Sequence, residues 1–164
     1  MAAKEAGHGS RASLNPRLAH CSCGSLRAVA SGEPIVVGMC HCEQCQRRTG
    51  SAFGVSVYFK QDQVRLSGPS TVFVRDGQDG RKLTQHFCPT CGSTIYWIAD
   101  IRPGYIGVAL GAFFDPHFPA PVRSVWEQSR QDWISIGSQV QRFPMNASGP
   151  LPGAQVSSEP TVRV

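Results

Sequence analysis

Seven cysteines occur in three short groups whose spacing is typical of metal ligands: Cys21-x-Cys23, Cys40-x-Cys42-x-x-Cys45 and Cys88-x-x-Cys91. A Cys-x-x-Cys turn presents two thiolates to a single ion. Pro89 inside the third group and Gly92 after it suit a tight turn whose backbone N–H groups can point at sulfur. We therefore predict that the cofactor is zinc.

The spacing identifies the ligands but not their partition between sites. Taken alone, it would combine Cys42-Cys45 with Cys88-Cys91 into an ordinary zinc ribbon. Three cysteines would then have no assigned site: Cys21, Cys23 and Cys40.

The rest of the composition indicates the compartment in which these cysteines occur and the kind of surface around them. Residues 1–15 lack the apolar run of a signal peptide or membrane span, so we expect a cytoplasmic protein without membrane contact. In a reducing compartment thiols stay free, and the odd number of cysteines also favours metal over disulfides. The net charge is +5, but the 16 Lys and Arg residues are scattered along the chain. This scatter indicates a plain basic surface and disfavours a nucleic-acid partner.

The elements that must position the cysteines are expected to be short strands. With 17 Gly and 12 Pro in 164 residues, the chain is too rich in helix breakers for long helices. β-prone stretches are bounded mostly by Gly, Pro or Asp. The predicted strands are Leu26–Ala30, Ile35–Met39, Phe53–Phe59, Val64–Ser67, Thr71–Arg75, Leu83–Phe87, Thr94–Ile98 and Tyr105–Leu110.

Two local patterns are the clearest. Large apolar residues alternate with smaller or polar ones over Phe53–Phe59, which predicts a strand with one face on the core. A single short helix is predicted over Glu43–Thr49, ended by Gly50 in a left-handed conformation. This helix would carry Cys42 and Cys45 near its N-terminal end.

The chain is expected to form one domain. Residues 1–16 and the Pro-, Ser- and Gly-rich residues 144–164 have the composition of a flexible N-terminal extension and a flexible tail. The folded domain would then comprise residues 17–143.

Three runs in this order resemble the glutathione-dependent formaldehyde-activating enzyme family, which includes the domain of centromere protein V. The likeness extends from about Leu18 to Phe143 and includes Asp100–Gly104, Trp126 and Trp133. The runs are Cys21-x-Cys23-Gly24, then Cys40-His41-Cys42-x-x-Cys45 followed by Gln46-Arg47-Arg48-Thr49-Gly50-Ser51-Ala52-Phe53, then Phe87-Cys88-x-x-Cys91-Gly92-Ser93.

The resemblance implies an all-β fold of the β-tent type with two zinc ions per chain. It assigns Cys21, Cys23, Cys88 and Cys91 to a closed structural zinc. It assigns Cys40, Cys42 and Cys45 to a second zinc with one open position, which is what a catalytic site keeps for substrate. The three cysteines of the second site are thus the candidate catalytic residues.

The activity implied by the resemblance is a carbon–sulfur lyase of the S-(hydroxymethyl)glutathione synthase type. A small thiol such as glutathione would add, as thiolate, to formaldehyde or a related small aldehyde. Arg47 and Arg48 could bind the substrate carboxylates, because guanidinium pairs with carboxylate in a bidentate manner. The alternative for both arginines is a solvated helix face.

Other polar and aromatic residues have two interpretations each. His41 or Glu43 could move the thiol proton, but a histidine between two ligands is more often simply packed or exposed. Trp97, Trp126 and Trp133 could line a pocket over the second zinc or belong to the core.

A second functional hypothesis is a non-catalytic, zinc-stabilised binding module resembling the centromere protein V domain. A long basic or Pro-rich N-terminal extension would favour it. The extension expected here is only about fifteen residues without a charge block, which favours the enzyme.

Overall fold

The computed structural model describes residues 16–77 and 80–147 and is mostly β-sheet with one α-helix. This confirms the predicted all-β class, while the β-tent type stays a prediction. The eleven strands of the described part are β1 (Arg17–His20), β2 (Arg27–Ala30), β3 (Val36–Cys40), β4 (Gly54–Lys60), β5 (Val64–Ser67), β6 (Thr71–Asp76), β7 (Lys82–Phe87), β8 (Thr94–Ala99), β9 (Tyr105–Ala109), β10 (Arg123–Val125) and β11 (Gln141–Phe143).

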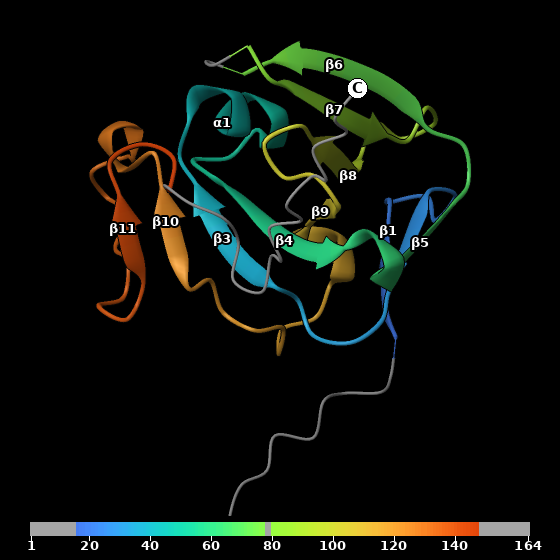
Figure 1. Cartoon of the computed structure of the whole chain (residues 1–164), viewed down its shortest axis with the longest axis horizontal. Helices are drawn as coiled ribbons and strands as arrows, with labels where there is room; N and C mark the ends of the chain where they lie inside the picture. Colours follow the sequence, from blue (N-terminus) through green and yellow to red (C-terminus); the bar gives the residue numbers. More distant parts are fainter. Residues whose placement is uncertain (1–15, 78–79, 148–164) are drawn as a thin grey trace, which may run out of the picture.

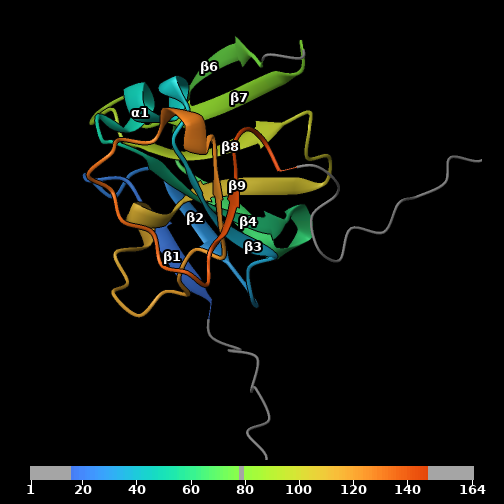
Figure 2. The same cartoon turned by 90° about the vertical axis from the view of Figure 1, so that its left-hand side faces the viewer.

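The strands form two sheets. The larger has the order β11-β10-β3-β4-β9-β8-β7-β6, and the smaller has the order β1-β2-β5. Neighbours are antiparallel except that β10 runs parallel to both β3 and β11. In Figure 1 the smaller sheet and the β10–β11 pair lie on opposite sides of β3 and β4. Figure 2 shows β6, β7, β8 and β9 following one another down the larger sheet.

The two faces of β4 explain where the core sits. Val57 and Phe59 are fully buried, whereas Ser56 and Tyr58 project from the opposite face and line a pocket. The alternation predicted from the sequence is therefore confirmed, and it separates the core from the pocket. Core side chains come from both sheets and include Ala19, Leu26, Ala28, Ala30, Val37, Val57, Phe59, Ile95, Ile106, Val108 and Phe113.

All eight predicted strands are present, each within one residue of its predicted ends. Three strands were missed: β1, β10 and β11. β1 contains no β-branched or aromatic residue that would indicate a strand. β10 and β11 have only three residues each, too few to show alternation, and β10 is defined by its pairing with the distant β3.

The helix α1 (Glu43–Thr49) has the predicted bounds. Gly50 adopts a φ of 64°, and its N–H donates to the carbonyl of Gln46 at 2.8 Å. This left-handed cap ends the helix as predicted. Short 3-10 helices occupy Gln61–Gln63, Leu110–Phe113 and Glu127–Ser129. No helix in the described ranges has the length and apolar character needed to cross a membrane.

The predicted extension and most of the predicted tail lie outside the described residues. The first four tail residues, 144–147, pack on the domain. The N–H of Trp126 donates to the Met145 carbonyl at 3.1 Å, and its indole Nε1–H donates to Asn146 Oδ1 at 3.0 Å. Ala147 is buried. The folded part therefore continues to at least residue 147.

Candidate metal centres and the adjoining pocket

Four cysteine sulfurs from the first and third groups gather in one place, here named the four-cysteine cluster: Cys21, Cys23, Cys88 and Cys91. Their Sγ atoms all lie within 4.8 Å of one another. The Cys21–Cys23 and Cys23–Cys88 sulfur distances are both 3.5 Å. Four sulfurs at zinc's usual bond length of about 2.3 Å stand about 3.8 Å apart in a tetrahedron, so this donor set fits zinc.

The four-cysteine cluster combines residues that follow strands of both sheets. Cys21 follows β1 of the smaller sheet, and Cys88 follows β7 of the larger one. Both of these sulfur-bearing residues are fully buried, whereas Cys23 and Cys91 are exposed. Metal binding here would join segments that are far apart in the sequence.

Hydrogen bonds favour the thiolate form of Cys21, which is the form that binds metal. Burial alone would raise the pKa of its thiol. The Leu26 N–H, 3.2 Å from the sulfur, and the Ser25 hydroxyl outweigh burial and lower the pKa of Cys21 to about 5. The deprotonated sulfur, which is the ligand form, is therefore favoured at neutral pH.

The other three sulfurs form the three-cysteine cluster: Cys40, Cys42 and Cys45. Cys40 ends β3, Cys42 is the N-cap of α1, and Cys45 lies in the first turn of the helix. These sulfurs also lie within 4.8 Å of one another. The partition into four and three cysteines excludes a ribbon that combines Cys42-Cys45 with Cys88-Cys91, because the two pairs belong to different clusters.

One thiolate is favoured within the three-cysteine cluster. Hydrogen bonds from the Cys40 and Cys45 thiols lower the pKa of Cys42 to about 2, against the opposing effect of burial, and the Arg75 charge adds to the lowering. Hydrogen bonding to Cys42 in turn raises the pKa of Cys40. A divalent cation would satisfy all three sulfurs at once and displace the remaining protons.

His41 points away from the sulfurs into a buried polar network. It is fully buried, and its Nε2 lies 3.0 Å from Ser124 Oγ. The Ser124 hydroxyl donates its only hydrogen to Glu127, so His41 Nε2–H must be the donor to Ser124. Burial lowers the pKa of His41 although Glu127 opposes this effect. The histidine is thus a packed residue that anchors the cysteine loop to β10.

Further hydrogen bonds hold the same loop. The His41 N–H donates to the Val125 carbonyl at 3.1 Å. The His41 carbonyl accepts from Gln46 Nε2 at 2.7 Å and from Ser129 Oγ at 3.1 Å. The backbone between Cys40 and Cys42 is therefore fixed by residues that sequence patterns did not identify.

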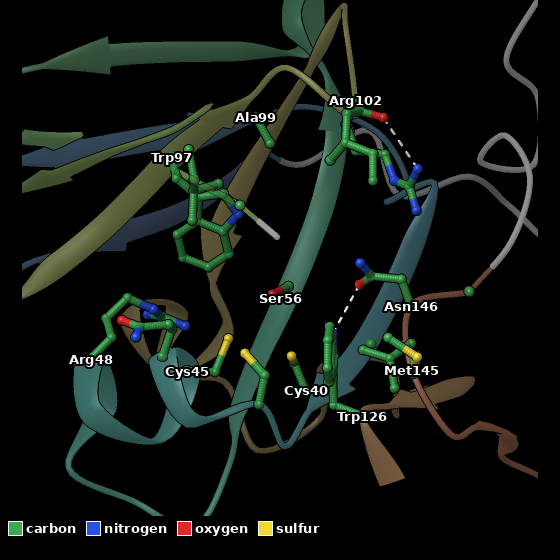
Figure 3. Close-up of a pocket in the computed structure, with 18 of the residues that line it drawn as sticks. Cys40, Cys45, Arg48, Ser56, Trp97, Ala99, Arg102, Trp126, Met145 and Asn146 are labelled. Carbon is green, nitrogen blue, oxygen red and sulfur yellow. Dashed lines mark hydrogen bonds between the residues drawn. The ribbon is translucent and has the colours of Figure 1, made fainter. Parts of the chain in front are cut away.

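A pocket of about 920 Å³ opens beside the three-cysteine cluster, and all three of its cysteines line it. The pocket lies on the face of the larger sheet opposite the core, over Gly38, Ser56 and Tyr58. Figure 3 shows Trp97 and Trp126 on opposite sides of this space, with Cys40 and Cys45 at one end. Both tryptophans are buried, so they serve at once as packed residues and as pocket walls.

The predicted substrate-binding arginines lie in different surroundings. Arg48 lines the pocket, and its guanidinium carbon is 4.5 Å from the centre of the Trp97 ring. Arg47 is exposed, does not line the pocket, and pairs with Glu43 at 2.7 Å on the solvent side of α1. Trp133 is 75% exposed and lies neither in the core nor on the pocket.

Several pocket residues were not singled out from the sequence: Ser56, Tyr58, Arg75, Arg102, Arg123 and Asn146. The positions of Ser56 and Tyr58 could have been found, since they alternate with the buried residues of β4. The arginines come from separate strands and a loop, and no sequence pattern joins them.

The absence of a side chain at Gly107 leaves the space that Trp97 occupies on the pocket wall. Trp97 on β8 pairs with Gly107 on β9, and a Cβ atom at Gly107 would lie 2.1 Å from the indole Nε1. The indole therefore occupies the space beside the glycine, and its Nε1–H donates to Tyr58 Oη at 3.3 Å. Burial raises the pKa of Tyr58, so this hydroxyl stays protonated.

Comparison with known proteins gives one family match. The family described as glutathione-dependent formaldehyde-activating enzyme matches residues 17–129. No curated protein matches the chain. One solved structure that is similar to it is a Rhodobacter sphaeroides protein from a structural genomics programme, with 19% identity and a TM-score of 0.46. That match covers 58% of this chain and 85% of the other.

Proposed function

We propose a carbon–sulfur bond-forming activity, on the premise that this chain belongs to the glutathione-dependent formaldehyde-activating enzyme family. The proposed reaction is of the S-(hydroxymethyl)glutathione synthase type. The thiol sulfur of glutathione bonds to the carbon of formaldehyde, the C=O π bond breaks, and the thiol proton ends on the oxygen. A cytoplasmic location, where glutathione keeps thiols reduced, belongs to this proposal.

One observation carries the proposal. The three-cysteine cluster has no fourth His, Cys, Asp or Glu ligand among residues 16–77 and 80–147, and all its cysteines line the pocket. An incomplete ligand set that borders a cavity is typical of a catalytic metal site, whereas a complete set is typical of a structural one.

Zinc fits both donor sets, and we infer one ion in each cluster. In the three-cysteine cluster, Cys40, Cys42 and Cys45 would hold an ion that supplies a Lewis acid and one free coordination position for the substrate sulfur. The four-cysteine cluster would hold the second ion without a free position.

The surrounding residues supply orientation and charge. Arg48 and Arg75 stand close enough for their charges to favour the thiolates of Cys45 and Cys42, respectively. The same positive field would favour a substrate thiolate. Trp97 and Trp126 limit access of water from two sides. Arg47 has no pocket contact through which to serve this reaction.

Exchange NMR with purified protein, glutathione and formaldehyde tests the proposal. We expect faster exchange between free and hydroxymethylated glutathione than in the spontaneous reaction, and loss of that acceleration in Cys42→Ser. The Arg65→Gln variant, changed on the exposed side of β5, is the matched control and should behave like the native protein. A native rate equal to the spontaneous rate would contradict the enzyme.

The same samples examine the binding-module hypothesis. Salt-sensitive association with DNA or tubulin, without any exchange acceleration, would favour that alternative.

A further inference from the structure

Two arginines line the pocket and are near enough for the charge of one to affect the other. Arg123 begins β10, and Arg102 lies in the loop between β8 and β9. Figure 3 shows Arg102 across the pocket from Cys40 and Cys45. Among the described residues, Arg102 Nη1 donates to the adjacent Ile101 carbonyl alone, at 3.2 Å. The Nε of Arg123 is buried and has no hydrogen-bond partner in the described structure.

The side chain of Arg123 is held in place by the sheet. Its register partner on β3 is Gly38, and a Cβ at that glycine would lie 3.1 Å from Arg123 Cγ. The aliphatic part of the arginine therefore runs closely over Gly38. This packing fixes the direction of the guanidinium without using any of its five N–H donors.

Neither arginine has a carboxylate partner within the described ranges. Two acidic residues line the pocket, and both are engaged with other cations: Glu43 with Arg47 at 2.7 Å, and Asp76 with Lys82 at 3.9 Å. Burial and the neighbouring charge of Arg102 lower the pKa of Arg123. Two like charges that are partly desolvated and unpaired are costly, and an anion between them removes that cost.

The strand registers place Arg123 near the three-cysteine cluster along the sheet. Arg123 is level with Gly38, two residues along β3 from Cys40, which is a backbone offset of about 7 Å. Arg102 is close enough to Tyr58 on the neighbouring strand for its charge to act on that phenol.

We propose that Arg102 and Arg123 form an anion subsite that binds a carboxylate of the thiol substrate. The inference rests on the proposed function for the identity of the sulfur end. It assigns carboxylate recognition to this pair, because Arg48 is stacked on Trp97 and Arg47 lies outside the pocket. We expect a tripeptide such as glutathione, whose carboxylates lie many bonds from its sulfur, to reach both the cluster and this pair more readily than cysteine.

Calorimetric binding tests the subsite separately from catalysis. The probes are glutathione, glutathione with both carboxylates converted to amides, cysteine, and coenzyme A as a phosphate-bearing thiol. We expect zinc-loaded native protein to bind glutathione about tenfold to a hundredfold more tightly than the diamide, as is typical for hydrogen bonds between charged groups. Equal affinity for the two would overturn the subsite, and tighter binding of coenzyme A would overturn the preference for carboxylate.

Variants assign the effect to residues. Arg102→Gln and Arg123→Gln should each abolish most of the preference for glutathione over the diamide, and Arg123→Lys should restore part of it. Arg65→Gln should keep the full preference. Circular dichroism and zinc content confirm folding, and Arg102→Gln alone decides the outcome if the Arg123 variant does not fold. A preference unchanged in Arg102→Gln would overturn its role.

The exchange assay separates failure of the subsite from failure of the proposed function. If the native protein accelerates exchange and the Arg102 variant raises KM equally for glutathione and diamide, the function stands and the subsite is wrong. If the native protein does not accelerate exchange but prefers glutathione over diamide through Arg102, the subsite stands and the reaction is wrong.

Discussion

The two cysteine clusters use the same side chain in opposite surroundings. The four-cysteine cluster lies between two sheets, with Cys21 and Cys88 buried and their neighbours supplying neutral donors from Leu26 and Ser25. The three-cysteine cluster borders a pocket of about 920 Å³ and has arginine charges nearby. One cluster completes its own ligand set, whereas the other leaves room for a partner.

In the proposed function, the number of sulfurs and the residues around them distinguish the structural cluster from the reactive one. A closed tetrahedron has nothing to offer a substrate and contributes its binding energy to the fold. A three-sulfur set in a positively charged cavity would offer a substrate both a free coordination position on the metal and a positive electrostatic field. Each prediction below changes one side of this comparison and leaves the other as its control.

The largest effect is expected from Cys88→Ser. Removing one sulfur from the four-cysteine cluster uncouples β1 from β7, and structural zinc sites commonly contribute on the order of 10 kcal/mol. We expect loss of dispersed amide NMR signals and of a cooperative thermal transition. A folded Cys88→Ser protein would show that the sheets hold together without this metal.

The matched change on the other side is Cys42→Ser. We expect the zinc content to fall from two ions per chain to one, with loss of exchange activity, while the NMR spectrum stays dispersed. Metal analysis and the exchange assay measure this together. Two ions per chain in the variant would remove the metal-based distinction between the clusters.

Acid should empty the clusters in a defined order. Metal binding displaces thiol protons, so affinity falls as the pH falls. Each cluster holds one thiol with a lowered pKa, about 5 for Cys21 and about 2 for Cys42, and at least one with a raised pKa, Cys23 and Cys40. Protons therefore compete for sulfur in both clusters as the pH falls, and the ion with only three sulfur ligands is held by fewer bonds. Stepwise acidification with a zinc-sensitive dye should release the three-cysteine ion first. A single release step would contradict this order.

The smallest effect is expected from Gly107→Ala. The added methyl would lie 2.1 Å from Trp97 Nε1 and force the indole toward the pocket. We expect a destabilisation of about 1–3 kcal/mol in denaturant titrations, typical of overpacking, and weaker thiol binding with both ions retained. Gly111→Ala, where nothing lies within 4 Å of the new methyl, is the control. Equal stability of both variants would show that Trp97 is free to move.

Local patterns in the sequence were sufficient to predict much of the fold. Alternation on β4 and the Gly50 cap of α1 are properties of a few neighbouring residues, so they could be predicted. The pairing of β10 with β3 could not, because three residues acquire their strand character from a partner more than eighty positions away.

The candidate site was predictable to a similar extent. Spacing identified the seven cysteines, but only the family resemblance divided them as the structure does. Arg102 lies in the Asp100–Gly104 run of the family resemblance, but the sequence assigned it no role, and Arg123 gave no signal, because their proximity depends on the larger sheet being assembled. Arg47 was selected for its proximity to Cys45 in sequence, yet the turn of the helix carries it to the solvent side.

The separation of the cysteines along the chain also determines the order in which the two clusters can be completed during synthesis. Cys40, Cys42 and Cys45 leave the ribosome almost together, whereas Cys23 precedes its neighbour Cys88 by 65 residues. At about 5–20 residues per second, that interval lasts about 3–13 s. During it the Cys21–Cys23 pair has no partner, while the three-cysteine segment can already capture an ion. The site proposed to be reactive would thus be loaded during synthesis, and the site proposed to hold the fold would close only after β7 has emerged.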